Sequence, residues 1–214
     1  VEAKPVVPVS EFLGVDLGLV KLATDSTGEA FSGEQVERLR RRRATARKQY
    51  QRAGTKSAKR RLRKMAGRQA RFQKHINHVI SKSLVAKAKT LGAGIALENL
   101  SGLRGRTEQT ASRSLRKRIG NWAFYQLRSF VEYKAAREGI PVVLVSPAYS
   151  SQTCSACGHC ERGNRQTQSE FVCLHCGFSM NADQNAALNI KAWAVRKPAP
   201  KVSTRKGQGQ SPRL

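Results

Sequence analysis

The fold of this chain is decided near its start, by the stretch Glu11-Phe-Leu-Gly-Val-Asp-Leu-Gly-Leu19 and its continuation Val20-Lys-Leu-Ala-Thr24. The apolar residues of this stretch alternate with others and lack helical spacing, so they predict strands rather than a helix. A tight-turn sequence, Asp25-Ser-Thr-Gly28, comes next, and Glu29-Ala-Phe31 resumes the strand pattern. These segments predict an antiparallel meander of three strands, with Asp16 in the middle of the first strand and Asp25 as a turn residue.

A helical hairpin is expected after the meander, at about residues 34–90. Pro is absent there, Gly is rare, and the helix-favouring residues Arg, Lys, Ala and Gln dominate. Gly54-Thr-Lys-Ser57 interrupts this pattern and would join two long helices. The second helix carries an apolar stripe at helical spacing near its end, which should pack on the core: Ile76, Val79, Ile80, Leu84 and Val85.

Further strands and helices alternate after the hairpin and predict an α/β chain. The apolar runs at 92–100 and 140–145 indicate two buried strands, with a helix at about 115–138 between them. A last helix is expected from about Asp183 to Val195, and the tail 197–214, rich in Pro, Gly, Ser and Lys, is expected to be disordered. We interpret three aromatic residues of the 115–138 helix as core rather than base-stacking residues: Trp122, Phe124 and Tyr125.

The charge of the chain indicates its class of partner. Forty Lys and Arg face fourteen Asp and Glu, which gives a formal net charge of +26. Nucleic acid is the expected partner, because binding to phosphates releases condensed counterions. A solvated helix face normally mixes both signs, but residues 38–74 contain no acid. We therefore interpret the hairpin as an arm that contacts phosphates, with these candidate contacts: Arg40, Arg41, Arg42, Arg43, Arg60 and Arg61.

No stretch of the sequence approaches the ~18 apolar residues that a membrane span needs, so no membrane partner is expected. The N-terminus lacks a charged region followed by an apolar one, as a signal peptide would have. An intracellular protein with reduced thiols is the resulting expectation.

The five cysteines all fall between Cys154 and Cys176, which points to a metal rather than to disulfides. Four of them have the spacing C-x2-C-x15-C-x2-C of a structural zinc site with no open coordination position: Cys154, Cys157, Cys173 and Cys176. Gly158 and Gly177 follow the two pairs, where a knuckle needs backbone freedom. Cys160, His159 and His175 are interpreted as residues outside the ligand set. Arg162 and Arg165 between the pairs could touch phosphate.

Three acids stand out by their position in so basic a chain. Asp16 is embedded in an apolar strand, Glu98 ends another, and Asp183 starts the last helix. A carboxylate in an apolar strand costs stability unless its charge has a partner. Carboxylates gathered at the ends of neighbouring strands bind paired Mg²⁺ ions about 3.5–4 Å apart, which activate water and stabilise the leaving oxygen. The order strand acid, strand acid, helix acid therefore favours a metal site.

Each acid also has a structural interpretation, which the residues alone leave open. Asp16 could be paired with a basic side chain, Glu98 could be an edge residue, and Asp183 could cap its helix. Glu108 lies in a loop without strand context and is left out of the site.

Four blocks, in this order, resemble the signature blocks of the OrfB/TnpB family, to which the type V CRISPR effectors are related: Gly14-Val-Asp-Leu-Gly18, Ala96-Leu-Glu-Asn-Leu100, Ser151-Gln-Thr-Cys-Ser-Ala-Cys-Gly158 and Asp183-Gln-Asn-Ala-Ala-Leu-Asn-Ile190. The resemblance covers roughly residues 10–196. It implies an RNase H-like (RuvC) α/β fold with an inserted basic helical hairpin and a zinc-ribbon-type finger.

The resemblance also implies domain boundaries and roles. Residues 1–150 would form the RuvC core with its first two catalytic blocks, 151–180 the zinc finger, and 181–196 the last RuvC helix. The family's catalytic acids carry over to Asp16, Glu98 and Asp183. Members of the family are RNA-guided endonucleases that cut DNA with Mg²⁺, for which Mn²⁺ can substitute. DNA and a guide RNA are thus expected partners, in the cytoplasm of a prokaryote and in association with its nucleoid.

The sequence departs from this family in two places. Full-length relatives carry a few hundred residues before the first catalytic block, whereas about ten precede it here. We expect either the C-terminal part of a longer protein or a natural miniature, with the missing N-terminal region or a longer relative as a further partner. Asn181 also stands where many relatives have an acid, two positions before the last catalytic Asp.

The main functional hypothesis is hydrolysis of DNA phosphodiester bonds by a two-metal mechanism. Asp16 would bridge both ions, and Glu98 and Asp183 would each complete one coordination sphere. A non-cleaving RNA- or DNA-binding scaffold derived from the same family is the alternative. A transposase that joins strands is a third hypothesis, for which no residue speaks specifically.

Overall fold

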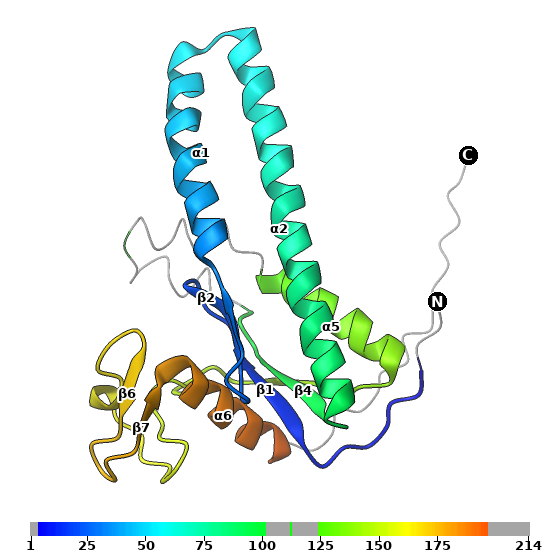
Figure 1. The fold of residues 1–214 in the computed structure, drawn as a ribbon, viewed down its shortest axis with the longest axis vertical. Helices are drawn as coiled ribbons and strands as arrows, with labels where there is room; N and C mark the ends of the chain where they lie inside the picture. Colours follow the sequence, from blue (N-terminus) through cyan, green and yellow to red (C-terminus); the bar gives the residue numbers. More distant parts are fainter. Residues whose placement is uncertain (1–3, 102–111, 113–123, 197–214) are drawn as a thin grey trace.

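The computed structural model describes residues 4–101, 112 and 124–196 of the 214-residue chain, and its mixed α/β arrangement is drawn in Figure 1. Along the chain the elements are β1 (Phe12–Asp16), β2 (Lys21–Asp25), β3 (Ala30–Ser32), α1 (Glu34–Ala53), α2 (Lys56–Thr90), β4 (Gly94–Glu98), α5 (Phe124–Glu138), β5 (Val142–Val145), the short 3-10 helix η1 (Arg162–Asn164), β6 (Glu170–Val172), β7 (Ser179–Asn181) and α6 (Ala182–Val195). The predicted meander, hairpin, later strands and last helix are present; of the helix expected at about 115–138, the structure describes Phe124–Glu138, and residues 115–123 lie outside the described part. Glu108, Trp122 and the expected tail at 197–214 lie outside the described residues.

Five strands form one sheet in the order β3-β2-β1-β4-β5, so β1 lies at its centre. β1, β2 and β3 pair antiparallel, as the meander predicted, while β4 and β5 add to the other side in parallel. Val15 of β1 lies opposite Leu97 of β4, and Leu97 lies opposite Leu144 of β5. The carboxyl ends of the three parallel strands are therefore level with one another.

The sheet is covered by helices on both faces (Figure 1). Alternate strand residues such as Leu13 and Leu97 pack with α2 and α5 in the larger apolar core. On the opposite face, residues such as Ala96 and Val143 pack with Ile190 of α6 in a smaller core. Burial on both faces explains why the parallel strands are apolar up to the carboxylates Asp16 and Glu98 that end β1 and β4.

Gly14 lets α6 lie directly on the central strand. A Cβ atom at Gly14 would stand 2.1 Å from the carbonyl oxygen of Ala187 and 2.6 Å from the backbone nitrogen of Lys191. Contacts this short are impossible, so only glycine permits the approach of α6 to β1. This packing places the start of α6 near the carboxyl edge of the sheet.

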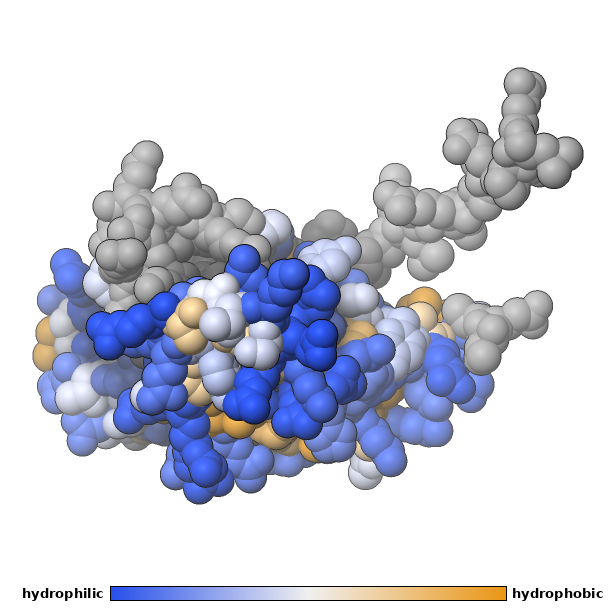
Figure 2. Space-filling view, turned by 90° about the horizontal axis from the view of Figure 1, so that it is seen from above, coloured by the Kyte–Doolittle hydropathy of each residue, from blue (hydrophilic) through white to orange (hydrophobic). Residues whose placement is uncertain are grey.

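The hairpin of α1 and α2 projects from the sheet as a long arm (Figure 1). Gly54 ends α1 in the left-handed conformation, with φ of 65°, and Thr55 caps α2 by accepting a hydrogen bond from the backbone of Ala58. α1 has no buried residue, and mostly hydrophilic residues cover the tip seen in Figure 2. The shaft of the hairpin is thus solvated, as its sequence predicted.

Two side chains that the sequence predicted to be buried are exposed. Val79, expected in the apolar stripe of α2, is 49 % exposed, because the buried face runs through Asn77, Ile80 and Leu84 instead. Tyr125, expected in the core, is 80 % exposed. The helix α5 turns Leu127, Val131 and Ala135 towards the sheet, and Tyr125 lies off this stripe.

None of the helices in the described part of the chain combines the length and apolar character that a membrane span requires.

Candidate functional site

Asp16 and Glu98 end two adjacent parallel strands. Asp16 is the last residue of β1 rather than its middle, which corrects the expectation from the sequence. Because side chains alternate along a strand, Asp16 shares the α6-facing side with Gly14, and Glu98 shares it with Ala96. Both carboxylates therefore lie on the same face, one residue beyond the aligned pair Val15 and Leu97.

Asp183 is the second residue of α6, which begins near this edge of the sheet. It is not the cap of the helix: the side-chain oxygen of Asn181 accepts hydrogen bonds from the backbone nitrogens of Asp183 (3.2 Å) and Gln184 (3.3 Å). The carboxylate of Asp183 is free to face two cations instead. Arg165 Nη2 lies 3.1 Å from its Oδ1, and Lys21 Nζ lies 3.7 Å from its Oδ2.

The charges of Glu98 and Asp183 act on the ionisation of Asp16. Burial raises the pKa of Asp16 well above its usual value, and the negative charges of Glu98 and Asp183 raise it further. Burial also raises the pKa of Glu98 to about 7, although a hydrogen bond from Ser150 Oγ (2.8 Å) and the charge of Arg165 favour its ionised form. A bound cation would stabilise the ionised form of carboxylates that are clustered and hard to ionise in this way.

The donor set of these acids fits a hard divalent cation. Carboxylate oxygens are the ligands that Mg²⁺ and Mn²⁺ prefer. In the part of the chain that the structure describes, the thiols of the cysteine cluster, and not these three acids, form a group of three or more such side chains close enough to share an ion. Asp183 is instead compensated by Lys21 and Arg165.

Several residues around the acids had no sequence signal of their own. Lys21 begins β2, and its Nζ also lies 3.1 Å from Oδ1 of Asn181. Ser150 reaches Glu98 from the loop after β5. Asn181 was noticed only as a departure from the family pattern, yet it caps α6 and holds Lys21. Thr24 lies opposite Asp16 on β2, and its buried hydroxyl has no hydrogen-bond partner among the described residues.

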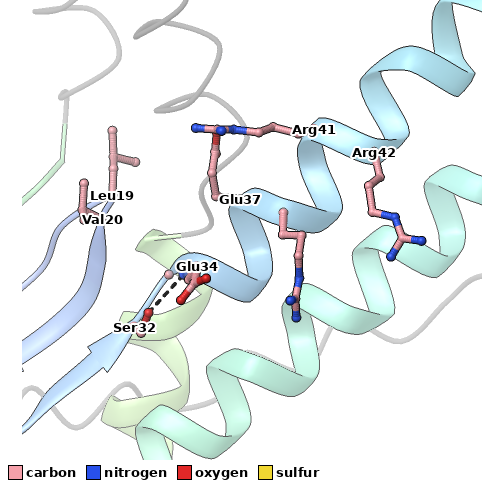
Figure 3. Close-up of a pocket in the computed structure, with 9 residues that line it drawn as sticks. Leu19, Val20, Ser32, Glu34, Glu37, Arg41 and Arg42 are labelled. Carbon is pink, nitrogen blue, oxygen red and sulfur yellow. Dashed lines mark hydrogen bonds and ion pairs between the residues drawn. The ribbon is translucent and has the colours of Figure 1, made fainter.

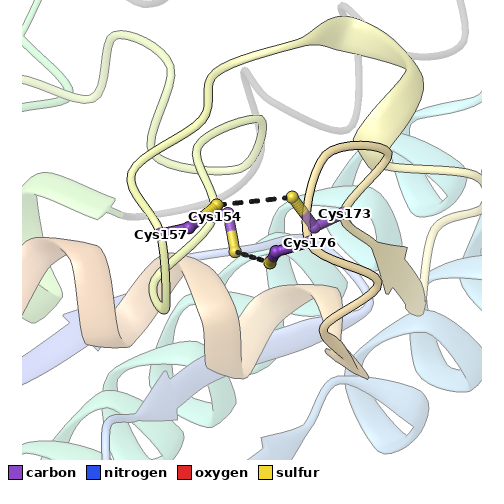
Figure 4. A group of neighbouring side chains, drawn as sticks. All are labelled: Cys154, Cys157, Cys173 and Cys176. Atoms are coloured by element: carbon purple, nitrogen blue, oxygen red, sulfur yellow. Dashed lines mark hydrogen bonds between the residues drawn. The ribbon is translucent and has the colours of Figure 1, made fainter.

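The four predicted zinc ligands come together in a module beside α6 (Figures 1 and 4). Their sulfur atoms all lie within 4.8 Å of one another. Gly158 and Gly177 have φ of 78° and 72°, and their amides donate to the carbonyls of Cys154 and Cys173, which closes the two knuckles. This arrangement could hold a zinc ion.

The pKa values of the thiols differ within the cluster. A hydrogen bond from the backbone amide of His159 favours the thiolate of Cys157, but burial and hydrogen bonds with the other three thiols raise its pKa to about 12. Burial disfavours the thiolate of Cys173, but hydrogen bonds from the backbone amides of Cys176 and His175 contribute to a pKa lowered to about 6. Cys160 is exposed and lies outside the cluster, as predicted. His159 is also outside it and contacts Glu161 at 3.0 Å.

The predicted phosphate contacts of the hairpin are not equivalent. Arg40 and Arg41 both bond to Glu37, at 2.6 and 3.0 Å. Arg43 is half-buried, and its Nη1 atom has no partner in the described structure. Arg61 lies over the ring of Tyr50 at 5.8 Å, while Arg42 and Arg60 are exposed.

Two families match this chain, one on each side of the undescribed segment. Residues 1–102 match the OrfB_IS605 family, described as "Probable transposase", and residues 124–190 match the Cas12f1-like TNB domain. The two matched ranges contain all three acids and all four cysteines of the cluster.

Individual relatives agree with these matches. The chain is 33 % identical over 202 residues to the CRISPR-associated endodeoxyribonuclease Cas12f1 of Sulfoacidibacillus thermotolerans, which covers 86 % of this chain and 46 % of that protein. It is 31 % identical over 129 residues to a TnpB-like protein of Methanocaldococcus jannaschii, covering 60 % of this chain and 45 % of that one. The chain thus spans about half the length of the curated relatives it matches.

A solved structure shares the fold. The cryo-EM structure of a Cas12f1–sgRNA–target DNA complex superposes with a TM-score of 0.67 at 22 % sequence identity. The match covers 86 % of this chain and 50 % of that one.

Proposed function

Because this chain belongs to the OrfB/TnpB family, we propose that it supplies the nuclease domain of an RNA-guided DNA endonuclease, which hydrolyses phosphodiester bonds with Mg²⁺. The observation that carries the proposal is the cluster of Asp16, Glu98 and Asp183 at one edge of the sheet, with raised pKa values at Asp16 and Glu98. So strong a clustering of acids is unexpected in a chain of net charge +26 unless the acids serve a cation.

The strand order supports an RNase H-like core. An antiparallel meander of β1, β2 and β3, extended by the parallel strands β4 and β5, is the arrangement expected of that fold. Residues 1–150 and 181–196 then form the nuclease core, and residues 151–180 form the zinc finger. The hairpin at about 34–90 is an insertion between the first two catalytic blocks.

All three acids would be ligands of the cations. Asp16 at the end of the central strand, Glu98 at the end of β4 and Asp183 at the start of α6 would hold the ions. When bound, Mg²⁺ supplies an activated water and stabilises the departing oxygen. The hydrogen bond from Ser150 holds the carboxylate of Glu98 in place.

Basic residues near the acids and on the hairpin would bind the nucleic acid. Lys21 and Arg165 lie against Asp183, where the phosphate of a bound strand would meet them. The exposed arginines of the hairpin would hold a phosphate backbone without base specificity. DNA and a guide RNA are the proposed ligands, and the zinc ion of the cysteine module is proposed to be structural.

Cleavage of single-stranded DNA by the purified chain tests the proposal. We expect cutting with Mg²⁺, loss of cutting with EDTA, and loss of cutting in Asp16→Ala. Glu132→Gln, which removes an exposed acid paired with Arg128, is the matched control and should cut normally. Cutting that persists in Asp16→Ala would overturn the assignment of the site.

A scaffold that binds without cutting is the second candidate, and the compensation of Asp183 by Lys21 and Arg165 favours it. If the chain binds tightly but does not cut, the experiment is repeated with a guide RNA and the N-terminal part of a longer relative. Continued absence of cutting would then favour the scaffold.

A further inference from the structure

A groove of about 790 Å³ lies between the loop after β1 and the first turns of α1. Leu19 and Val20 form its wall on the loop side, and Glu37, Arg41 and Arg42 line it from the helix (Figure 3). Its volume is within the roughly 300–1,000 Å³ of pockets that bind small molecules. The groove is separate from both the acids and the cysteine cluster.

The loop wall of the groove is held in place by backbone contacts. The amide of Gly33 donates a 2.7 Å hydrogen bond to the carbonyl of Val20. A Cβ atom at Gly33 would lie 2.6 Å from that same oxygen, so the close contact requires glycine. Val20 is 54 % exposed even though its backbone is fixed, so it presents an apolar surface to the groove.

The same loop connects the groove to the acids. Only Leu17 and Gly18 separate Asp16 from Leu19 along the chain, which limits the distance between their Cα atoms to about 11 Å. Lys21, the residue after Val20, reaches Asn181 and Asp183. Leu19 packs with the larger core, on the other face of the sheet from the acids, so a bound strand would pass the carboxyl end of β1 to place one nucleotide in the groove and a phosphate at the acids.

The lining combines apolar surface with cations that are free to bind a phosphate. Glu37 is already bonded to Arg40 and Arg41. Within the described ranges 4–101, 112 and 124–196, Arg38 and Arg42 have no ion pair. An unpaired nucleotide has the matching chemistry, because its base offers a flat apolar face and its phosphate accepts hydrogen bonds from arginine.

We propose that this groove is a subsite for one unpaired nucleotide of the strand that is presented to the acids. The base packs against Leu19 and Val20, and the adjoining phosphate contacts Arg38 and Arg42. The identity of the strand rests on the proposed nuclease function, but occupation of the groove does not require cutting.

Photo-crosslinking in EDTA tests the subsite without cleavage. The probes are single-stranded 20-mers of thymidine, each with 4-thiothymidine at one position, at saturating protein. We expect cross-links, mapped by mass spectrometry, on the peptide that contains Leu19 and Val20. Arg38→Gln/Arg42→Gln should lower their yield by up to about fivefold, as expected for the loss of a phosphate contact worth about 1 kcal/mol.

The matched control is Lys89→Gln/Lys191→Gln, which removes two cations that are paired with Glu138 and Glu11 and should keep the cross-link. Both double variants are compared with the wild type by thermal unfolding, and Val20→Ala serves as a second groove variant that removes only apolar surface. Absence of cross-links at residues 19–20, or equal loss in the groove variant and the Lys89→Gln/Lys191→Gln control, would overturn the subsite. Cross-linking without Mg²⁺-dependent cutting, also after a guide RNA and the N-terminal part of a longer relative are supplied, would keep the subsite and reject the nuclease. Cutting without cross-linking would keep the nuclease and reject the subsite.

Discussion

Arg165 of the cysteine module donates a hydrogen bond of 3.1 Å to the carboxylate of Asp183 in α6. Its guanidinium also donates to the carbonyl of Gln168 at 2.7 Å, which fixes the side chain within the module. The fold of the module thus determines where a cation stands beside one of the three acids. A structural metal would therefore influence the candidate nuclease site without taking part in its chemistry.

Removal of zinc should unfold the module and release Arg165 from Asp183. Thiolate coordination and local folding are coupled, so Cys154→Ser or a chelator should lower the melting temperature and alter the circular dichroism. Cys160→Ser is the matched control, because this exposed thiol is outside the cluster and should leave the melting curve unchanged. An unchanged melting curve after chelation of a zinc-loaded protein would contradict the structural role.

The raised pKa of Glu98 predicts how stability depends on pH in the absence of divalent cations. In the unfolded chain this carboxyl ionises near its ordinary pKa of 4.5, whereas in the folded chain its pKa is about 7. Between these values the folded state holds the extra proton, so its free energy of unfolding falls as the pH rises. Above pH 7 the penalty should reach about 3 kcal/mol.

Glu98→Gln should remove this penalty while keeping an oxygen that accepts from Ser150. Urea unfolding at pH 8 should show the variant to be more stable than the wild type, with a much smaller difference at pH 5. Glu132→Gln controls for loss of an exposed acid. Equal differences at both pH values would show that ionisation of Glu98 is not their cause.

Gly14→Ala should weaken the packing of α6 on β1. Its Cβ would collide with the carbonyl oxygen of Ala187, which is backbone and cannot rotate away. We expect a loss of at least about 1–3 kcal/mol in the free energy of unfolding, since overpacking forces backbone shifts. In Gly67→Ala, the nearest atom is the end of a flexible Arg71 side chain at 3.6 Å, and this variant should instead gain up to about 1 kcal/mol. Chemical denaturation of both variants checks the contrast.

The parts of the fold that follow from local pattern were predictable from the sequence. Alternating apolar residues gave the meander, and the absence of Pro with a break at Gly54 gave the hairpin. The sequence could not show which face of α5 turns inward, and so it misplaced Tyr125. That choice depends on the crossing of α5 over α2 and the sheet, which no local pattern records.

In the candidate site, too, local sequence patterns predicted some residues, and tertiary contacts bring in the others. The cysteine spacing identified the thiol cluster because its ligands come in two local pairs. Glu98 and Asp183 were recognisable as carboxylates at a strand end and a helix start, whereas Asp16 was expected in the middle of its strand. Lys21, Ser150 and Arg165 were not assigned to the acids, because they are brought there by β2, by the loop after β5 and by the module. Contacts between such distant segments depend on tertiary packing.

Thr24→Val tests a buried hydroxyl beside Asp16. The hydroxyl of Thr24 is buried without a partner in the described structure, and valine has nearly the same shape. If this hydroxyl only costs desolvation, the variant should be more stable by about 1 kcal/mol and should cut DNA normally. Greater stability with a loss of cutting would instead place the hydroxyl among the groups that act on substrate or water.

Neutralising the hairpin tip should weaken binding to all nucleic acid sequences alike. Arg60→Gln/Arg61→Gln removes two cations from a face that carries no acid between residues 38 and 74. If both contact phosphates, the slope of log affinity against log salt should become shallower by roughly 1–2, because fewer counterions are released. Fluorescence anisotropy with two oligonucleotides of unrelated sequence, over a range of NaCl concentrations, measures this slope. Lys89→Gln/Lys191→Gln removes two cations that are paired with Glu138 and Glu11 and should leave the slope nearly unchanged. A loss confined to one of the two sequences would contradict a role in holding the backbone, since phosphates carry no sequence information directly.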